Sequence, residues 1–122
     1  MNFKATVPIY WQIVEMMKQR LLSGEWKPGD KVPTVREIAL EVGVNPNTVQ
    51  KAVSYLENEG FLHAQRTSGR YVTTEEAAIE KARLQWIAER IEDLMVSLRN
   101  IGCQDKEIHA LLIQHLEQNE RG

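Results

Sequence analysis

The sequence of 122 residues contains a single cysteine, Cys103, and therefore no internal disulfide bond. A lone thiol is typical of a protein that works in a reducing compartment. The chain also lacks any run of 18 apolar residues, so no segment is predicted to span a membrane. Its first eight residues hold no apolar stretch of the length that a secretory signal needs. We therefore expect a cytoplasmic protein with no membrane partner.

Residue combinations that carry catalysis or bind cofactors are also missing from the sequence. There is no glycine-rich phosphate loop, since Gly29 stands in an isolated Pro-Gly turn. Cys103, His109 and His115 come nearest to a metal-binding set, but the two histidines are six positions apart and point to different faces of a helix. We therefore predict no enzymatic activity, no metal and no other cofactor.

The net charge of −2 is distributed unevenly along the chain. Residues 1–73 hold nine basic and seven acidic side chains, whereas residues 74–122 hold six basic and ten acidic ones. The first part therefore carries +2 and the second −4. Because the basic excess is small, any affinity for nucleic acid must depend on where individual cations lie rather than on a general field.

One short stretch near the middle of the chain predicts a helix with two opposite faces. One face carries four apolar side chains at helical spacing: Val49, Ala52, Val53 and Leu56. The other face carries four polar side chains at the same spacing: Asn47, Gln50, Lys51 and Ser54. A helix with a buried apolar side and a free polar side is suited to lie in the major groove of DNA and read base edges.

Two further helices are predicted before this one. The first covers residues 8–22 and stops before Gly24, which favours a left-handed turn. The second begins at the capping box formed by Thr34 and Glu37 and runs to about residue 42. A very short strand is compatible with residues 31–32 in the loop between the two helices.

The third helix and a β-hairpin complete the predicted domain. Asn45 is a strong N-cap, and Pro46 suits the first helical position. Residues 61–65 and 70–73 read as two strands joined by a hairpin loop at residues 66–69. Three helices followed by a hairpin form the winged helix-turn-helix arrangement, a mainly α fold in which the hairpin is the wing.

The rest of the chain predicts two helices that serve dimerisation. Thr74 and Asp105 are the expected caps, and Gly102 separates the helices. We accordingly divide the chain into a DNA-binding domain, residues 1–73, and a helical dimerisation segment, residues 74–122. The expected dimer interface consists of a heptad-like seam on the first helix and one residue of the second: Leu84, Ile87, Ile91, Leu94, Leu98, Ile101 and Leu112. The alternative is that this seam packs onto the winged helix of its own chain.

A series of short motifs runs along residues 8–72. They are Pro8-Ile9-Tyr10, Pro28-Gly29-Asp30-Lys31-Val32-Pro33-Thr34-Val35-Arg36-Glu37-Ile38-Ala39, Gly43-Val44, Thr48-Val49, Leu56-Glu57 and Gly69 with Tyr71-Val72. In this order they resemble the DNA-binding domain of the GntR family of bacterial transcription regulators. Residues 44–49 and the short helical tail are similar to the YtrA subfamily. The resemblance implies a sequence-specific regulator, expected to be a repressor, that binds an inverted-repeat operator as a homodimer.

The resemblance also implies which residues contact DNA. The resemblance places Arg36 at a phosphate or at a guanine edge. It places the front of the third helix in the major groove and the wing near the minor groove. The residues predicted to contact DNA are Arg36, Asn45, Asn47, Thr48, Gln50, Lys51, Arg66, Thr67, Ser68, Gly69 and Arg70. The chain departs from the family pattern at Pro46, where many relatives carry a basic residue. It departs again in the wing, which reads Thr-Ser-Gly-Arg-Tyr over residues 67–71.

These residues also have purely structural interpretations. Asn45 caps a helix whether or not it meets DNA, and the polar face of the third helix can simply be solvated. Arg36 can pair with Glu37 or Glu41 within its own helix.

Structural alternatives extend to the wing and to the function as a whole. Arg66 and Arg70 can serve as charges that protect an exposed strand edge. The alternative function is that of a winged-helix adaptor that binds proteins and uses its cations only for solubility. Whether an unidentified small-molecule effector binds between subunits stays open.

Overall fold

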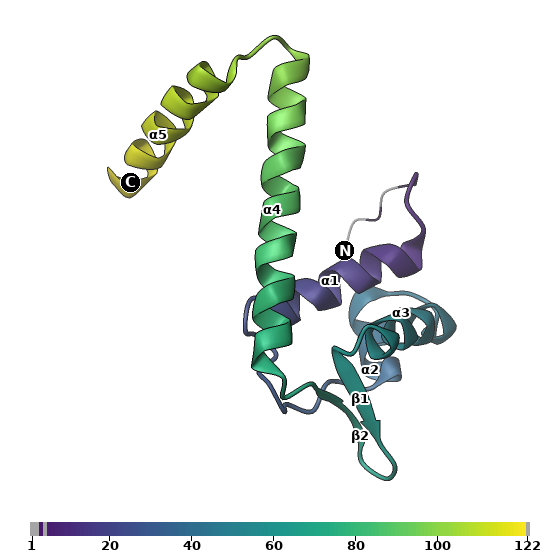
Figure 1. The fold of residues 1–122 in the computed structure, drawn as a ribbon. Helices are drawn as coiled ribbons and strands as arrows, with labels where there is room; N and C mark the ends of the chain where they lie inside the picture. Colours follow the sequence, from purple (N-terminus) through teal and green to yellow (C-terminus); the bar gives the residue numbers. More distant parts are fainter. Residues whose placement is uncertain (1–2, 4, 122) are drawn as a thin grey trace. The chain divides into compact units, whose positions relative to one another are not determined.

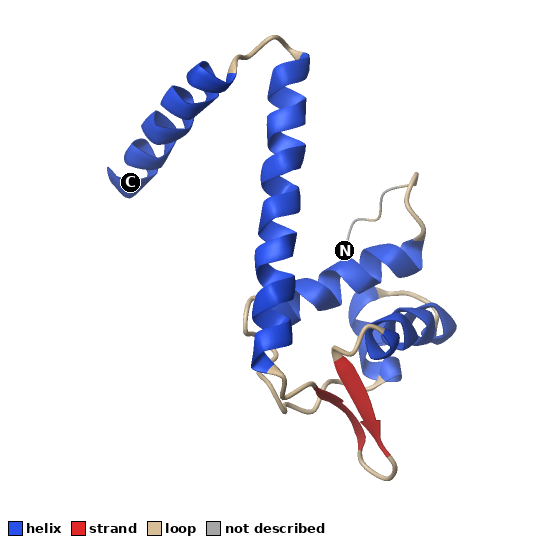
Figure 2. Ribbon diagram, viewed as in Figure 1, coloured by secondary structure: helices blue, strands red, loops and turns tan. Residues whose placement is uncertain are grey.

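The structure is a computed structural model that describes Phe3 and residues 5–121. Within this part of the chain, five helices and one two-stranded sheet follow one another (Figure 2). They are α1 (Ile9–Leu22), α2 (Val35–Val42), α3 (Pro46–Asn58), β1 (Leu62–Gln65), β2 (Gly69–Val72), α4 (Glu76–Asn100) and α5 (Asp105–Arg121). The predicted mainly α winged helix-turn-helix fold is confirmed, and Figure 1 shows the hairpin projecting beyond α2 and α3.

By packing, the chain forms two compact units, Met1–Ala82 and Arg83–Gly122. The division falls inside α4 because the start of this helix belongs to the first unit, where Ile79 packs against the core. The predicted boundary between residues 73 and 74 separates functions rather than packed units, and it stays a prediction.

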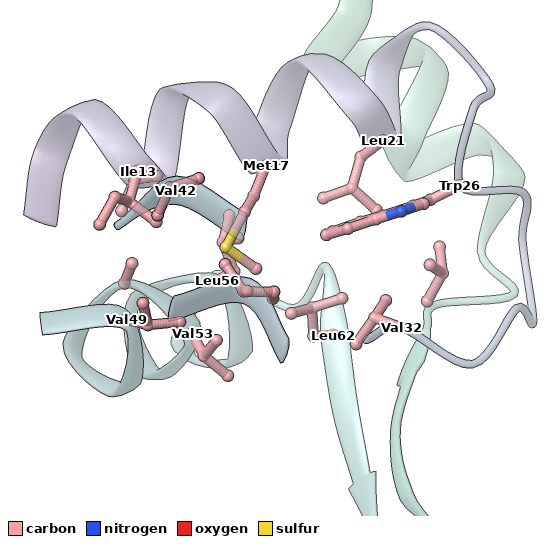
Figure 3. Packing of buried hydrophobic residues seen from close by; sticks show 14 of the residues in the cluster. Ile13, Met17, Leu21, Trp26, Val32, Val42, Val49, Val53, Leu56 and Leu62 are labelled. Atoms are coloured by element: carbon pink, nitrogen blue, oxygen red, sulfur yellow. The ribbon is translucent and has the colours of Figure 1, made fainter. Parts of the chain in front are cut away.

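A single apolar core joins the three helices and the hairpin of the first unit (Figure 3). Ile13, Met17 and Leu21 lie on successive turns of α1 and face the other elements of the core. The buried side chains of this core are Ile13, Val14, Met17, Leu21, Trp26, Val32, Ile38, Ala39, Val42, Val49, Ala52, Val53, Leu56, Leu62 and Val72. Because α3 contributes its whole apolar stripe, the core determines which side of α3 stays outside.

A capping box and a left-handed glycine define the two ends of α2. The hydroxyl of Thr34 accepts from the N–H of Glu37 at 3.1 Å, and the Glu37 carboxylate accepts from the N–H of Thr34 at 3.1 Å. This is the predicted capping box. Gly43 ends α2 at φ 73°, a left-handed conformation that glycine adopts at little cost. Three residues thus connect α2 to α3.

A segment of the α1–α2 loop covers the second edge of the hairpin. Residues 29–32 run beside β2, where the N–H of Val32 donates to the carbonyl of Arg70 at 3.0 Å. The short strand expected at residues 31–32 is reduced to one bridge between Lys31 and Tyr71. β2 therefore has neighbours on both sides. The two strands of the hairpin begin and end within one residue of their predicted bounds.

Two predicted helix caps in the second half of the chain are wrong. α4 begins at Glu76, and it is the hydroxyl of Thr73, not Thr74, that accepts the N–H of Glu75 at 3.1 Å. Thr73 follows directly on β2 and is buried, and its bond to Glu75 lies just before the helix. Asp105 is the first residue of α5 rather than its cap, and its carboxylate accepts two hydrogen bonds from Arg99, at 2.8 and 3.0 Å.

No helix in the part of the chain that the structure describes combines the length and the apolar character needed to cross a bilayer.

Candidate DNA-binding surface and dimer interface

The two faces of α3 are separated as the sequence predicts. The apolar stripe is buried, and the members of this stripe are Val49, Ala52, Val53 and Leu56. On the polar stripe, Asn47 and Lys51 are exposed, while Gln50 and Ser54 are half-buried. The helix is therefore held from behind and presents amide, amine and hydroxyl groups on its free side.

A cleft of about 500 Å³ lies between the start of α2, the polar side of α3 and the wing. It brings together residues that are far apart in the sequence: Lys31, Val32, Pro33, Thr34, Val35, Arg36, Gln50, Val53, Ser68, Gly69 and Arg70. Five of the predicted DNA-binding residues thus line one cavity: Arg36, Gln50, Ser68, Gly69 and Arg70. The other six lie outside its lining, all of them exposed except the half-buried Thr48: Asn45, Asn47, Thr48, Lys51, Arg66 and Thr67.

Arg36 is exposed at the cleft because its possible acidic partners are engaged elsewhere. Glu37 belongs to the capping box, and hydrogen bonds from the backbone and hydroxyl of Thr34 lower the pKa of its carboxyl. Glu41 accepts from Arg20 of α1, with one Nη1–Oε2 distance of 3.3 Å, and this hydrogen bond lowers its pKa. The intrahelical ion pair considered for Arg36 is therefore not formed.

Asn45 caps α3 and keeps part of its amide available. Its Oδ1 accepts from the N–H of Asn47 at 2.8 Å, which confirms the capping role. The amide nitrogen Nδ2 is not used in this bond. Asn45 and Asn47 are both exposed at the front of α3, so the cap and a contact to DNA are compatible.

Neighbouring residues hold the next two polar side chains of α3 in place. The Nε2 of Gln50 donates to the hydroxyl of Ser54 at 3.2 Å, which leaves Oε1 and one N–H for an outside partner. The Nζ of Lys51 lies 3.9 Å from the centre of the Tyr10 ring. Both side chains are therefore partly ordered before any ligand arrives.

The tip of the wing exposes Arg66 and Thr67 in a three-residue turn, with Ser68 half-buried beside them. Gly69 follows at φ 110°, and a Cβ at this position would lie 3.1 Å from the Cε of Lys31. Lys31 thus runs along the wing into the cleft, where it adds a cation that the sequence analysis did not assign. The only sequence signal was the short strand expected at residues 31–32.

Arg70 is half-buried and forms an ion pair with Glu57 of α3. Since residues 29–32 cover the outer side of β2, Arg70 does not protect a free edge. Its predicted contact to DNA stays a prediction.

Most of the expected dimer interface is uncovered in the single chain. Ile87 and Leu98 are half-buried, and the other five residues are exposed: Leu84, Ile91, Leu94, Ile101 and Leu112. Ile101 is 80% exposed, although it is a large apolar side chain. Leu98 and Leu112 also line a second cleft of about 420 Å³ beside the buried Ile108. Such a stripe of exposed apolar surface is typical of an interaction site.

Cys103 lies at the same cleft, half-buried. Burial, with a contribution from Glu107, raises the pKa of its thiol. The thiolate form, which reacts with oxidants, is therefore disfavoured. Within the described residues, no group of three His, Cys, Asp or Glu side chains is placed to hold a metal ion.

Comparison with known proteins identifies this arrangement. The family model for bacterial regulatory proteins of the gntR family matches residues 9–72, from the start of α1 to the end of β2. The chain belongs to the GntR family. The predicted family and its subfamily likeness are confirmed, and the relatives are transcription regulators rather than enzymes.

Individual GntR proteins share more than the winged helix with this chain. The HTH-type transcriptional repressor YtrA of Bacillus subtilis (strain 168) is 36% identical over 107 residues, which cover 87% of this chain and 82% of YtrA. The structure of a GntR family transcriptional regulator from Listeria monocytogenes aligns with a TM-score of 0.85 at 29% identity, over 92% of this chain and 98% of that one. The likeness to both proteins thus extends into the helical tail.

A protein domain solved in complex with its operator is also similar to part of this chain. The DNA-binding domain of AraR, in complex with operator ORR3, aligns with a TM-score of 0.54 at 27% identity. The alignment covers 60% of this chain and 88% of that one.

Proposed function

We propose that this GntR regulator reads its operator by placing the polar face of α3 in the major groove. The observation that carries the proposal is the cleft in which Gln50 of this face lies together with Arg36 and the wing, while the apolar stripe of α3 is buried in the core. Asn47, Thr48 and Gln50 supply the donors and acceptors that base edges require, and Asn45 adds the free nitrogen of its amide. Lys51 and Arg36 are exposed cations suited to phosphates or to a guanine.

The wing completes the contact at the neighbouring minor groove. Arg66 is the cation at its tip, and Thr67, Ser68 and Gly69 bring the backbone close to the sugar-phosphate chain. Lys31 lies beside Gly69 in the cleft and adds a second positive charge next to the wing. Arginine is favoured in a narrow minor groove, where the negative potential is strongest.

The functional form is a homodimer held by the α4–α5 segment. Five of the expected interface residues form an apolar stripe at heptad-like spacing on α4, Ile101 directly follows this helix, and Leu112 lies on α5. Most of the seven are exposed. A second copy of the chain presents the same stripe and is the partner that matches it. Two winged helices related by a two-fold axis then meet two half-sites of an inverted repeat. The second cleft includes Leu98 and Leu112, so the partner subunit rather than a private effector covers it.

Repression, rather than activation, is inferred from the similarity of this chain to a named repressor. YtrA of Bacillus subtilis is named a repressor, and this chain matches most of its length. We infer that the present protein also represses, in the bacterial cytoplasm.

Selection of bound duplexes from a random pool tests the proposal. The wild-type chain is expected to enrich an inverted repeat whose half-sites lie about 10 base pairs or a multiple apart, bound by two chains per duplex. Enrichment of a single half-site bound by one chain contradicts the dimer, and absence of any enrichment contradicts sequence-specific binding.

A further inference from the structure

The ion pair between Glu57 and Arg70 is a direct side-chain link between α3 and the wing. Glu57 lies in the last turns of α3, and Arg70 lies in β2, 13 positions further along the chain. The two side chains are only 28% and 29% exposed. A pair shielded to this extent is screened less by salt than an ion pair on the open surface.

The alternation of the strand turns Arg70 toward the body of the domain. Side chains two positions apart share one face of a strand, and Val72 is completely buried. The ladder sets Arg70 opposite Ala64, and Val72 opposite the buried Leu62. The guanidinium therefore extends from the face of the hairpin that packs on the core.

The ion pair lies at a point along the hairpin from which it can orient the wing. Leu62 and Val72 fix the base of the hairpin in the core. Arg70 lies only one ladder position from the last strand pair, Gln65 with Gly69, before the exposed turn. The ion pair thus connects the hairpin to α3 close to the tip that is proposed to enter the minor groove.

Simple electrostatics predicts that Glu57 weakens DNA binding. A carboxylate near a DNA-binding surface repels phosphates, so its removal alone should strengthen binding. In the structure, however, this carboxylate neutralises Arg70 and holds it on α3. The two views predict changes of opposite sign for the same substitution.

We propose that Glu57 and Arg70 form a positioning pair that sets the wing relative to α3. Arg70 supports DNA binding through the orientation of the wing rather than by touching DNA, which differs from its role in the sequence analysis. Glu57 favours binding despite its negative charge. This inference rests on the proposed use of α3 and the wing in operator binding.

Affinities of charge variants for one duplex test the proposal. The probe is a duplex that the wild-type chain selects from a random pool, and binding is followed by fluorescence anisotropy. Glu57→Gln and Arg70→Met are each expected to weaken binding by about 5- to 10-fold. The variant that combines Glu57→Gln with Arg70→Met should lose no more affinity than either single variant, because both substitutions remove the same interaction. The swapped variant Glu57→Arg with Arg70→Glu restores part of the loss.

Glu59→Gln is the matched control, because it removes the same charge from the exposed C-cap of α3. It should leave affinity unchanged or raise it. If Glu57→Gln also leaves affinity unchanged or raises it, the proposal is overturned.

The salt dependence separates a positioning role from a phosphate contact. Loss of a phosphate contact reduces the slope of log K against log salt by about 0.9. Arg70→Met is expected to keep the wild-type slope while affinity falls. A slope reduced by that amount makes Arg70 a phosphate ligand and overturns the proposal.

Hydrogen exchange in the DNA-free protein keeps this inference separate from the proposed function. Glu57→Gln and Arg70→Met should accelerate exchange of the backbone amides of residues 63–71, whereas Glu59→Gln should not. If the wild-type chain selects no duplex but the wing amides respond in this way, operator binding fails and the positioning pair stands. Exchange rates that match the wild type in both variants overturn the pair itself.

Discussion

The ammonium group of Lys51 lies 3.9 Å from the centre of the Tyr10 ring, so α1 holds a side chain of α3. Lys51 itself is exposed. A cation over an aromatic ring is stabilised by about 0.5–1 kcal/mol at an exposed site. A lysine that is already ordered loses less conformational freedom when it meets a phosphate.

We expect Tyr10→Leu to weaken binding to any duplex by about 2- to 5-fold, in proportion to the lost cation–π interaction. Lys51→Ala should weaken it further and reduce the salt slope by about 0.9. Tyr10→Phe keeps the ring and serves as the control, with affinity close to wild type. Anisotropy titrations at several salt concentrations measure all three. If Tyr10→Phe loses as much as Tyr10→Leu, the hydroxyl rather than the ring is responsible.

Gln50 is expected to distinguish one sequence from another. Gln50→Ala should lower affinity for the selected duplex by about 10-fold or more, because a paired contact to a base is worth about 1–3 kcal/mol. Affinity for a duplex of random sequence should hardly change. Ser54→Ala removes only the hydroxyl that orients Gln50 and should have a smaller effect of the same kind. Equal losses on both duplexes remove Gln50 from the residues that read bases.

Alanine substitutions at Gly69 and Gly60 separate the effect of backbone strain on stability from the effect of wing shape on DNA binding. Both have a positive φ, 110° and 84°, and alanine in such a conformation costs about 1 kcal/mol. A Cβ added at Gly69 would lie 3.1 Å from the Cε of Lys31, whereas a Cβ added at Gly60 would have no atom within 4 Å. Both Gly69→Ala and Gly60→Ala should lower the free energy of unfolding in urea, but only Gly69→Ala should also weaken DNA binding. If Gly69→Ala binds DNA as well as the wild type does, the wing tolerates this change and the prediction is wrong.

The dimer is expected to depend on one side of α4. Leu94 and Val96 are similarly exposed, 41% and 46%, but two positions apart on a helix they point in nearly opposite directions. Leu94→Asp should convert the dimer to monomers in sedimentation experiments and abolish tight binding to an inverted repeat. Val96→Asp introduces the same charge outside the seam and should leave the dimer intact. Dimers that persist in Leu94→Asp place the interface elsewhere.

Local patterns predicted the helix-turn-helix, because its determinants are close together in the sequence. The spacing of Val49 and Val53 identifies the buried face of α3, and Asn45 identifies its start. The capping box of Thr34 and Glu37 spans only three positions. Each of these features forms within one or two turns of helix, so no knowledge of the tertiary fold is needed.

Contacts between distant segments could not be read in the same way. Lys31 meets the wing 38 positions further along the chain, at Gly69, and no periodicity links the two residues. Strand alternation from Val72 would have turned Arg70 toward the core, but its partner on α3 becomes evident only from the packing of the hairpin. The prediction that Thr74 caps α4 failed for a related reason, since the hydroxyl bond just before the helix is made by the buried Thr73 instead.

The cap of α3 bears on the proposed contact between Asn45 and DNA. One lone pair of the Asn45 Oδ1 is taken by the N–H of Asn47, and both hydrogens of the amide nitrogen stay available to an outside partner. Such donors fit the N7 or O6 of guanine, the N7 of adenine or the O4 of thymine. In the proposed complex, the bond that starts the helix thus also orients the donor that faces the groove.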